Sequence, residues 1–221
     1  MSADERFGPT RRGGPVFRWL GEPLAIDLAN TVMVTRSEAD GGGSGQWDEG
    51  VDLLSSPADL RLWLSAEGER LAAFAIDEEA DLDAIHELRQ AVRELFDAAA
   101  RGRKSPPHAV AVVNAASAAS PVAPQLAAAS GSPSVAPLAE DKSLAAMLGA
   151  VARSAIEHLA GTPPGELRIC LAPSCGMFYL GKRRWCCSAC GNRARAARHY
   201  RRKRAAAASS SGAGVPAGRR L

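Results

Sequence analysis

Apolar residues recur at helical spacing in four segments of the chain. In segment 56–68, Ser56 at the N-cap and Pro57 at the next position predict a helix that closes near the glycine at its end. Segments 77–102, 105–119 and 143–159 also have an apolar residue at every third or fourth position. This spacing predicts amphipathic helices that bury one face each in a shared core.

The remaining segments lack helical spacing. Residues 15–34 alternate between apolar and polar positions, which predicts a short strand or hairpin running into a helix start. Residues 41–45 predict a flexible loop, and residues 120–139, rich in Pro, Ala and Ser, predict mainly loop with a short strand pair as the alternative. Together these patterns predict a mainly α (α+β) fold, with a helical N-terminal domain and a short strand or hairpin near its start.

Prolines and low-complexity sequence set the predicted domain boundaries. Residues 1–14 predict a disordered leader, and Gly161, Pro163 and Pro164 end a helical domain that spans residues 15–162. A small module follows at 166–204. Residues 205–221 are rich in Ala, Ser and Gly and predict a disordered tail, because they cannot bury enough apolar surface to offset the entropy of ordering.

Charge divides the chain at Glu166, its last acidic residue. Residues 167–221 contain 13 Lys and Arg and no acid, whereas residues 1–166 carry 24 acidic and 14 basic side chains. Residues 1–166 therefore carry a net charge of about −10 and residues 167–221 a net charge of about +13, which indicates a polyanion as the partner of the C-terminal segment. The chain has no run of 18 apolar residues and no apolar secretory segment near its start, so we expect a cytoplasmic protein without a membrane partner.

All five cysteines lie within 21 residues, in the spacing Cys170-x4-Cys175-x10-Cys186-x3-Cys190, with Cys187 beside the third. A tight, odd cluster favours a metal site over a disulfide framework. Two close pairs of thiolates predict one structural, tetrahedral zinc ion, whose binding would supply the folding free energy of so small a module. Spacing alone leaves Cys186 and Cys187 as alternatives for the third ligand.

The segment after Cys190 predicts a basic helix that enters at Gly191 and Asn192 and extends to residue 204. On a helical wheel, one face is expected to dock on the zinc module and the other to meet phosphates or base edges. The predicted docking residues are Ala196, Ala197 and Tyr200, and the opposite face carries Arg195, Arg198 and Arg202.

Arginine dominates the basic helix, which suits bidentate contact with phosphate or guanine. Because the module has no aromatic array of the kind that stacks RNA bases, we expect duplex DNA in preference to RNA. The candidate nucleic-acid contacts are Arg183, Arg184, Arg193, Arg195, Arg198, Arg201, Arg202, Lys203 and Arg204.

The C-terminal segment resembles the CGNR zinc-finger family, named for the tetrapeptide that stands here as Cys190-Gly191-Asn192-Arg193. The Arg-Arg-Trp-Cys sequence at 183–186 matches the family as well, and this match favours Cys186 as the third ligand. Cys187 stands where the family usually has serine. Segment 24–31 and the pair Leu88-Arg89 resemble the ABATE domain that precedes this finger, which implies a stress-related transcription regulator.

Asp27, Asn30 and Thr31 are polar residues inside an apolar stretch. They either line a small-molecule pocket in a sensor domain or serve local capping and buried hydrogen bonding. His86 and His158 each stand alone in a predicted helix, and no nucleophile–base pair or phosphate-binding glycine loop can be assembled. The sequence therefore predicts no enzyme.

The leading hypothesis is a zinc-dependent DNA-binding transcription regulator whose N-terminal domain senses a ligand or forms a homodimer. Two alternatives remain open. In one, the protein is a thiol or metal stress sensor in which oxidation of Cys187 or its neighbours releases zinc, since thiolates near cations are reactive. In the other, it is a protein-interaction module whose basic helix neutralises an acidic partner or its own acidic body.

Overall fold

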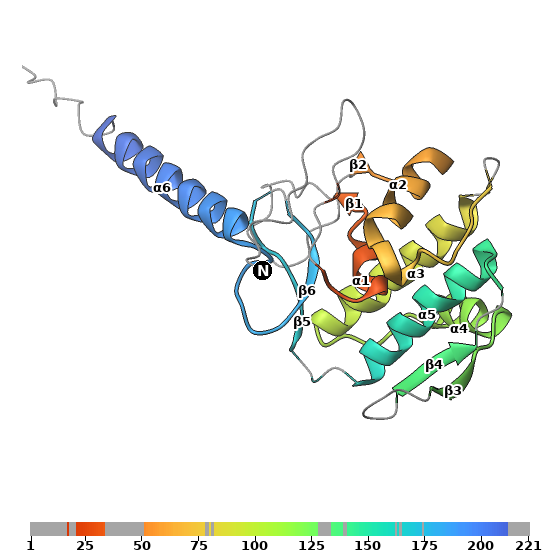
Figure 1. The fold of residues 1–221 in the computed structure, drawn as a ribbon. Coiled ribbons are helices and arrows are strands. Elements are labelled where there is room, and N and C mark those ends of the chain that lie inside the picture. Colours follow the sequence, from red (N-terminus) through yellow and green to blue (C-terminus); the bar gives the residue numbers. More distant parts are fainter. Residues whose placement is uncertain are drawn as a thin grey trace, which may run out of the picture.

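The computed structural model describes residues 17, 21–33, 51–77, 80, 82–127, 134–138, 141–161, 163, 165–173 and 175–211. The predicted leader at 1–14 and the predicted loop at 41–45 lie outside these residues. The described chain forms a helical N-terminal body and a smaller C-terminal module, from which one long helix projects (Figure 1).

Helices build most of the N-terminal body. In chain order they are α1 (Leu24–Ala29), α2 (Pro57–Glu67), the short 3-10 helix η1 (Gly68–Arg70), α3 (Asp83–Ala100), α4 (Pro107–Ala119) and α5 (Leu144–Gly161). α3, α4 and α5 pack against one another, and α1 lies against α3 and α5 (Figure 1). The helices expected at 56–68, 105–119 and 143–159 are confirmed within two residues, with the Ser56 hydroxyl accepting a hydrogen bond from the Asp59 amide at 3.2 Å.

The start of α3 differs from the sequence prediction. We expected the helix from about Asp77, whereas it begins at Asp83. Two residues before Asp77, the Ala75 amide donates a 3.1 Å hydrogen bond to the Lys142 carbonyl, which lies just before α5. The Ala80 amide donates to the Asp77 carbonyl at 3.3 Å, which is a bond between residues three apart and not the four-residue bond of an α-helix.

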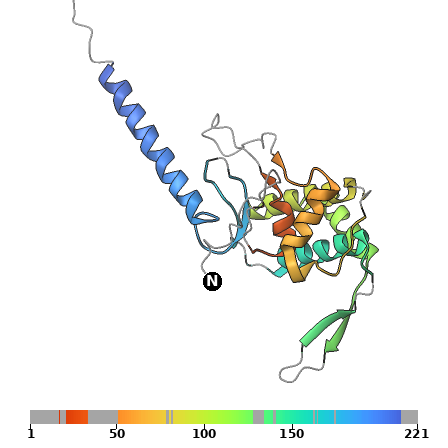
Figure 2. The same cartoon turned by 45° about the horizontal axis from the view of Figure 1, so that its top comes forward.

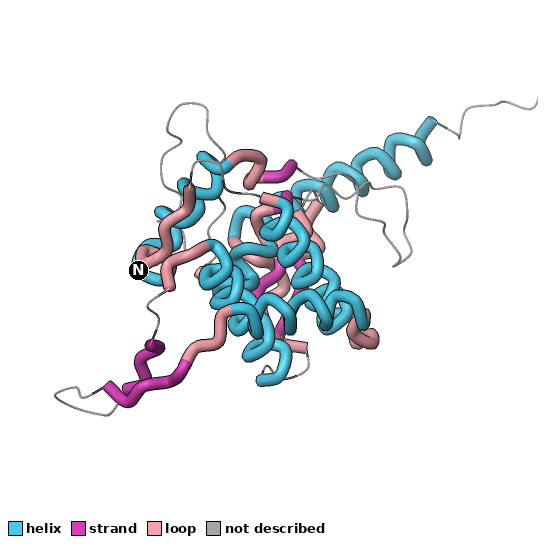
Figure 3. Tube along the Cα trace, turned by 90° about the vertical axis from the view of Figure 1, so that its right-hand side faces the viewer, coloured by secondary structure: helices cyan, strands magenta, loops and turns pink. Residues whose placement is uncertain are grey.

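The strands form three short antiparallel pairs, shown in magenta in Figure 3. They are β1 (Val32–Met33) with β2 (Val51–Asp52), β3 (Ala123–Ala127) with β4 (Ser134–Leu138), and β5 (Leu167–Ile169) with β6 (Phe178–Leu180). The β3–β4 hairpin stands away from the body in Figure 2. The mainly α fold with few short strands is confirmed, and the strand pair considered for 120–139 is formed.

A short strand is formed within residues 15–34, as expected, but it follows the helix and does not run into it. Residues 24–29 form α1, and the strand follows it at Val32 and Met33. The alternation of apolar and polar residues suggested a strand because polar residues usually face solvent. In α1 they do not, since nearly the whole helix is buried, including Asp27 at 5% exposure. Such a short helix owes its stability to tertiary packing rather than to propensity.

One hydrophobic core joins the N-terminal body to the C-terminal module. It contains Trp63, Leu88, Phe96 and Val151 from the helices, and also Leu167 and Phe178 from the β5–β6 hairpin. The hairpin of the module is therefore part of the core of the body. Among the helices of the described residues, none is both long and apolar enough to cross a membrane.

Candidate metal centre and basic helix

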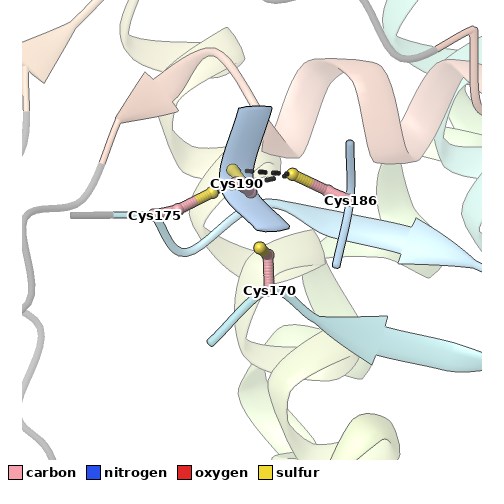
Figure 4. A group of neighbouring side chains, drawn as sticks. All are labelled: Cys170, Cys175, Cys186 and Cys190. Carbon is pink, nitrogen blue, oxygen red and sulfur yellow. Dashed lines mark hydrogen bonds between the residues drawn. The ribbon is translucent and has the colours of Figure 1, made fainter. Parts of the chain in front are cut away.

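Four cysteines converge at the end of the β5–β6 hairpin (Figure 4). Cys170 follows β5, Cys175 precedes β6, and Cys186 and Cys190 flank the start of α6 (Ser188–Ser211). Their sulfur atoms all lie within 4.8 Å of one another, and all four side chains are buried. The cysteines are free rather than joined in disulfides.

Backbone contacts explain how a short segment brings these thiols together. The Cys170 amide donates to the Met177 carbonyl at 2.9 Å, which extends the β5–β6 pairing, and the Cys175 amide donates to the Ala172 carbonyl at 3.0 Å, which tightens the loop between the first two cysteines. Gly191 permits the close approach of Trp185, since a Cβ at this position would lie 3.2 Å from Trp185 Cδ1. The aromatic ring thus packs at the base of the helix.

The donor set and its surroundings fit a single structural zinc ion. Four thiol sulfurs at this separation form the cage that Zn²⁺ takes in structural sites. Hydrogen bonds among the thiols lower the pKa of Cys190 and Cys170, that of Cys170 to about 7, and raise the pKa of Cys175 and Cys186, so the four groups share their protons as one cluster. Arg193 Nη2 donates to Cys190 Sγ at 3.1 Å, as an outer partner of a thiolate ligand does.

The structure also distinguishes Cys186 from Cys187, which the spacing left as alternatives for the third ligand. Cys186 Sγ lies 3.8 Å from Cys175 Sγ and 3.5 Å from Cys190 Sγ, inside the cluster. Cys187 is half-buried outside the group of four, with its sulfur 4.0 Å from that of Cys186. Cys187 is thus a fifth thiol beside the metal centre.

The basic helix begins one turn earlier than the sequence suggested. α6 starts at Ser188 rather than near Asn192, so Cys190 lies in its first turn. Cys190, Gly191 and Ala194 are buried against the module, whereas Ala196 is exposed and Tyr200 is 67% exposed. The predicted docking face is therefore wrong for Ala196 and Tyr200, because the buried cysteine fixes the rotation of the helix, whereas Ala197 is half-buried.

The C-terminal end of α6 also differs from the prediction. The disordered tail was expected from residue 205, but the helix continues to Ser211, and residues 212–221 lie outside the described part. Four alanines at 205–208 explain the extension, since alanine has the highest helix propensity and each added residue adds one hydrogen bond to a helix already nucleated.

Two of the candidate nucleic-acid residues contact other parts of the chain. Arg193 is half-buried against Cys190. Arg183 forms a 2.5 Å ion pair with Glu22 of the N-terminal body, although its side chain stays 49% exposed. Both therefore have a structural contact that the sequence did not reveal.

The other basic side chains of the set are exposed. The Arg184 guanidinium carbon lies over the Trp185 ring, 5.1 Å from its centroid, and Arg195 donates a hydrogen bond to the Asn192 side chain. The remaining members are Arg198, Arg201, Arg202, Lys203 and Arg204. Within the described residues none of these five forms an ion pair.

Asn30 attaches the N-terminal body to the C-terminal module, called the finger below. Its Oδ1 accepts from the Phe178 amide at 2.8 Å and its Nδ2 donates to the Phe178 carbonyl at 3.0 Å, so one side chain pairs with β6 as a neighbouring strand would. Glu22 adds a second attachment, because its Oε2 accepts from the Leu180 amide at 3.1 Å. The finger is thereby held at a fixed position on the body.

Asp27 and Thr31 are also engaged in buried contacts. Asp27 accepts a 2.7 Å bond from Arg70, which also binds Glu67. The Thr31 hydroxyl donates to the Leu28 carbonyl at 2.7 Å and accepts from Arg89 at 3.1 Å. These contacts match the hydrogen-bonding alternative, and a ligand role for Asp27, Asn30 and Thr31 stays a prediction.

Sequence reasoning missed Glu22, Glu67 and Arg70. Burial raises the pKa of Asp27 to about 7 and that of Glu67 to about 8, because two desolvated carboxyls share the single guanidinium of Arg70. One Glu67 oxygen is buried without a hydrogen-bond partner among the described residues. The available signal was the i,i+3 pair of Glu67 and Arg70 at the end of a predicted helix.

Comparison with protein families agrees with this architecture. The ABATE family model, described as "Putative stress-induced transcription regulator", matches residues 22–162, and the CGNR zinc-finger model matches residues 166–203. Neither is an enzyme family. No curated protein matches the chain. Since the first model alone covers more than half of the 221 residues, the chain belongs to the ABATE family and ends in a CGNR zinc finger.

Proposed function

We propose that this protein is a zinc-dependent, DNA-binding transcription regulator in which α6 contacts duplex DNA. The observation that carries the proposal is the exposed face of Arg195, Arg198 and Arg202 on a helix anchored at the metal centre. Figures 1 and 2 show that α6 projects from the body, with its basic length clear of the other elements. A helix of 24 residues is about 36 Å long, enough to lie in a major groove.

Charge favours phosphate over other partners. No acidic side chain occurs in residues 167–221, so nothing within the module repels a polyanion. Arginine side chains can grip phosphates or bind guanine edges bidentately. Arg184, whose guanidinium lies over the Trp185 ring, is available for a further backbone contact at the base of the helix.

The zinc ion would serve to orient the helix. Cys190 ties the first turn of α6 to the hairpin, and Arg193 braces the same sulfur. This pair of contacts sets which residues of the helix face outward. The N-terminal domain, attached through Asn30 and Glu22, would then act as the sensor or dimerisation unit of the regulator.

Removing two arginines of the exposed face is expected to weaken DNA binding without unfolding the protein. In the double variant Arg198→Ala/Arg202→Ala, affinity for random duplex DNA should fall on the order of tenfold or more. The slope of log affinity against log salt should become shallower by about 1.8, since each lost phosphate contact contributes about 0.9. Fluorescence anisotropy across a salt series measures both quantities.

The matched control removes two positive charges from the N-terminal domain. Lys104→Ala/Lys142→Ala changes two exposed lysines and alters the net charge equally. We expect this variant to keep the affinity and salt slope within about twofold, because its lysines lie away from α6. Equal losses in the two double variants would show a nonspecific effect of net charge and contradict the proposed DNA-binding face.

A second candidate function, peroxide sensing, rests on the 4.0 Å separation of the Cys186 and Cys187 sulfurs. Hydrogen peroxide could oxidise both thiols to a disulfide, with release of two water molecules, and so remove Cys186 from the metal. Cys187→Ser should then retain one zinc per chain but release it far more slowly in peroxide. The same release rate in variant and parent, followed with a chromogenic zinc indicator, would refute this function.

A further inference from the structure

A partly open groove lies beside the C-terminal end of α2. It has a volume of about 380 Å³ and is bounded by the last two turns of α2, by η1 and by the segment that follows. Its lining residues are Arg61, Leu64, Ser65, Gly68, Leu71, Ala72, Phe74 and Ile76. This volume lies within the range of small-molecule sites in proteins.

The lining combines an apolar floor with one cation. Leu64 and Leu71 are buried, and Phe74 and Ile76 are half-buried. Arg61 is exposed and forms no ion pair with any described residue, although the surrounding chain carries an excess of acidic side chains. An unpaired guanidinium beside apolar surface favours a ligand that has an anionic head and an apolar body.

We propose that this groove binds a small carboxylic acid with an aromatic or aliphatic body, whose carboxylate pairs with Arg61. At roughly 30 Å³ per group, the volume of a water molecule in the liquid, the groove holds about a dozen non-hydrogen atoms. Ser65 also lines the groove, and its hydroxyl would supply a second hydrogen bond to the acid. Leu64, Leu71 and Phe74 would cover the body of the acid.

Side-chain contacts connect this groove to the finger. Leu64, Ser65 and Gly68 line it, and the same helical turn carries Glu67 and continues into Arg70. Arg70 donates to the Glu22 carbonyl at 2.8 Å and to Asp27 at 2.7 Å.

From Glu22 the contacts continue into the finger. The Glu22 carboxylate accepts from the Leu180 amide and from Arg183, next to the metal centre. A ligand that shifts the end of α2 would therefore move the residues that hold β6. The expectation that DNA affinity changes with the ligand rests on the proposed function.

The site is tested without DNA, on the zinc-loaded full chain. Benzoate, salicylate, phenylacetate, indole-3-acetate and octanoate are titrated by calorimetry, with thermal unfolding as a second readout. We expect at least one acid to bind saturably and to raise the melting temperature. Its affinity should fall at least tenfold in Arg61→Gln, remain unchanged in the matched Lys104→Gln, and fall for the corresponding neutral amide.

A groove-filling variant gives an independent check. Ser65→Trp places an indole at the exposed rim of the groove and should abolish binding while the chain stays folded. Absence of saturable binding by all five acids, or binding that survives both Arg61→Gln and Ser65→Trp, would overturn the proposal.

DNA affinity, measured with and without the acid, tests only the coupling step. A change in DNA affinity supports the coupling. An acid that binds without changing DNA affinity refutes the coupling but not the binding site. A protein that binds the acid but no DNA at all would refute the proposed function alone.

Discussion

Replacing Cys190 by serine is expected to abolish stoichiometric zinc binding and to lower the melting temperature of the whole chain. Cys190 is buried in the first turn of α6, and its sulfur lies 3.5 Å from that of Cys186. Serine cannot replace a thiolate ligand, so the cage would lose one of four donors. The effect should spread beyond the finger, because Leu167 and Phe178 of the zinc-bearing hairpin are part of the core of the N-terminal body.

The expected size of this effect follows from zinc-finger energetics. Structural zinc supplies about 10–16 kcal/mol of apparent binding free energy in isolated fingers near neutral pH. If only about 4 kcal/mol of this is lost from the folding of the full chain, the melting temperature falls by roughly 8–16 °C. Circular dichroism gives the transition, and metal analysis of the purified protein gives the zinc content.

The matched control is Cys187→Ser, one residue from a cluster member. Because the Cys187 sulfur lies outside the group of four, this variant should keep one zinc per chain and the parental melting temperature within a few degrees. Addition of a strong chelator to the parent should reproduce the Cys190→Ser result. Full zinc content in Cys190→Ser, or zinc loss in Cys187→Ser, would contradict the assignment of the metal centre.

The sequence predicted the elements whose signals are local. Helix α2 has its own serine cap and proline at its first position, and the charge boundary at Glu166 separates body from finger. The cysteine cluster could be predicted as well, because ligands of a structural zinc lie close together along the chain. The helix cap and the cysteine cluster are each complete within about 20 residues, and the charge boundary needs only a count along the chain.

The features that sequence analysis missed depend on contacts between distant residues. Nothing in the sequence near Asn30 indicates that its amide pairs with Phe178, 148 positions away. The rotation of α6 was predicted wrongly because hydrophobicity favoured Tyr200 as the docking residue, whereas the metal ligand at Cys190 decides which side is buried. A covalent or metal constraint outweighs a weak apolar stripe on an otherwise basic helix.

These distant contacts make the finger a fixed extension of the ABATE domain rather than a tethered module. The two faces of the β5–β6 hairpin belong to different clusters: Phe178 and Leu167 pack in the body, whereas Met177 and Tyr179 pack with the cysteines. Any event that changes the core of the body therefore acts on the hairpin that carries the metal. Under the proposed function, this shared hairpin would be the physical connection between the N-terminal domain and the helix that contacts DNA.

The link can be tested by Phe178→Ala, which is expected to destabilise the full chain by about 3–5 kcal/mol. Phe178 is fully buried, meets Phe96 edge to face at 5.7 Å and lies under Arg93 at 5.5 Å, so truncation removes apolar contact and leaves a cavity. Equilibrium unfolding in urea measures the loss of unfolding free energy. The matched control is Tyr200→Ala, which truncates an aromatic side chain on the exposed part of α6 and is expected to cost less than about 0.5 kcal/mol.

The form of the transition distinguishes a shared core from two independent units. If body and finger unfold together, Phe178→Ala lowers the midpoint of far-ultraviolet circular dichroism and the midpoint of zinc release by the same amount. A variant that releases zinc early while the helices of the body keep their parental midpoint would show that the finger folds separately. Because Phe178 lies in the strand that Asn30 holds, equal shifts would also mean that the body stabilises the metal centre without contributing a ligand to it.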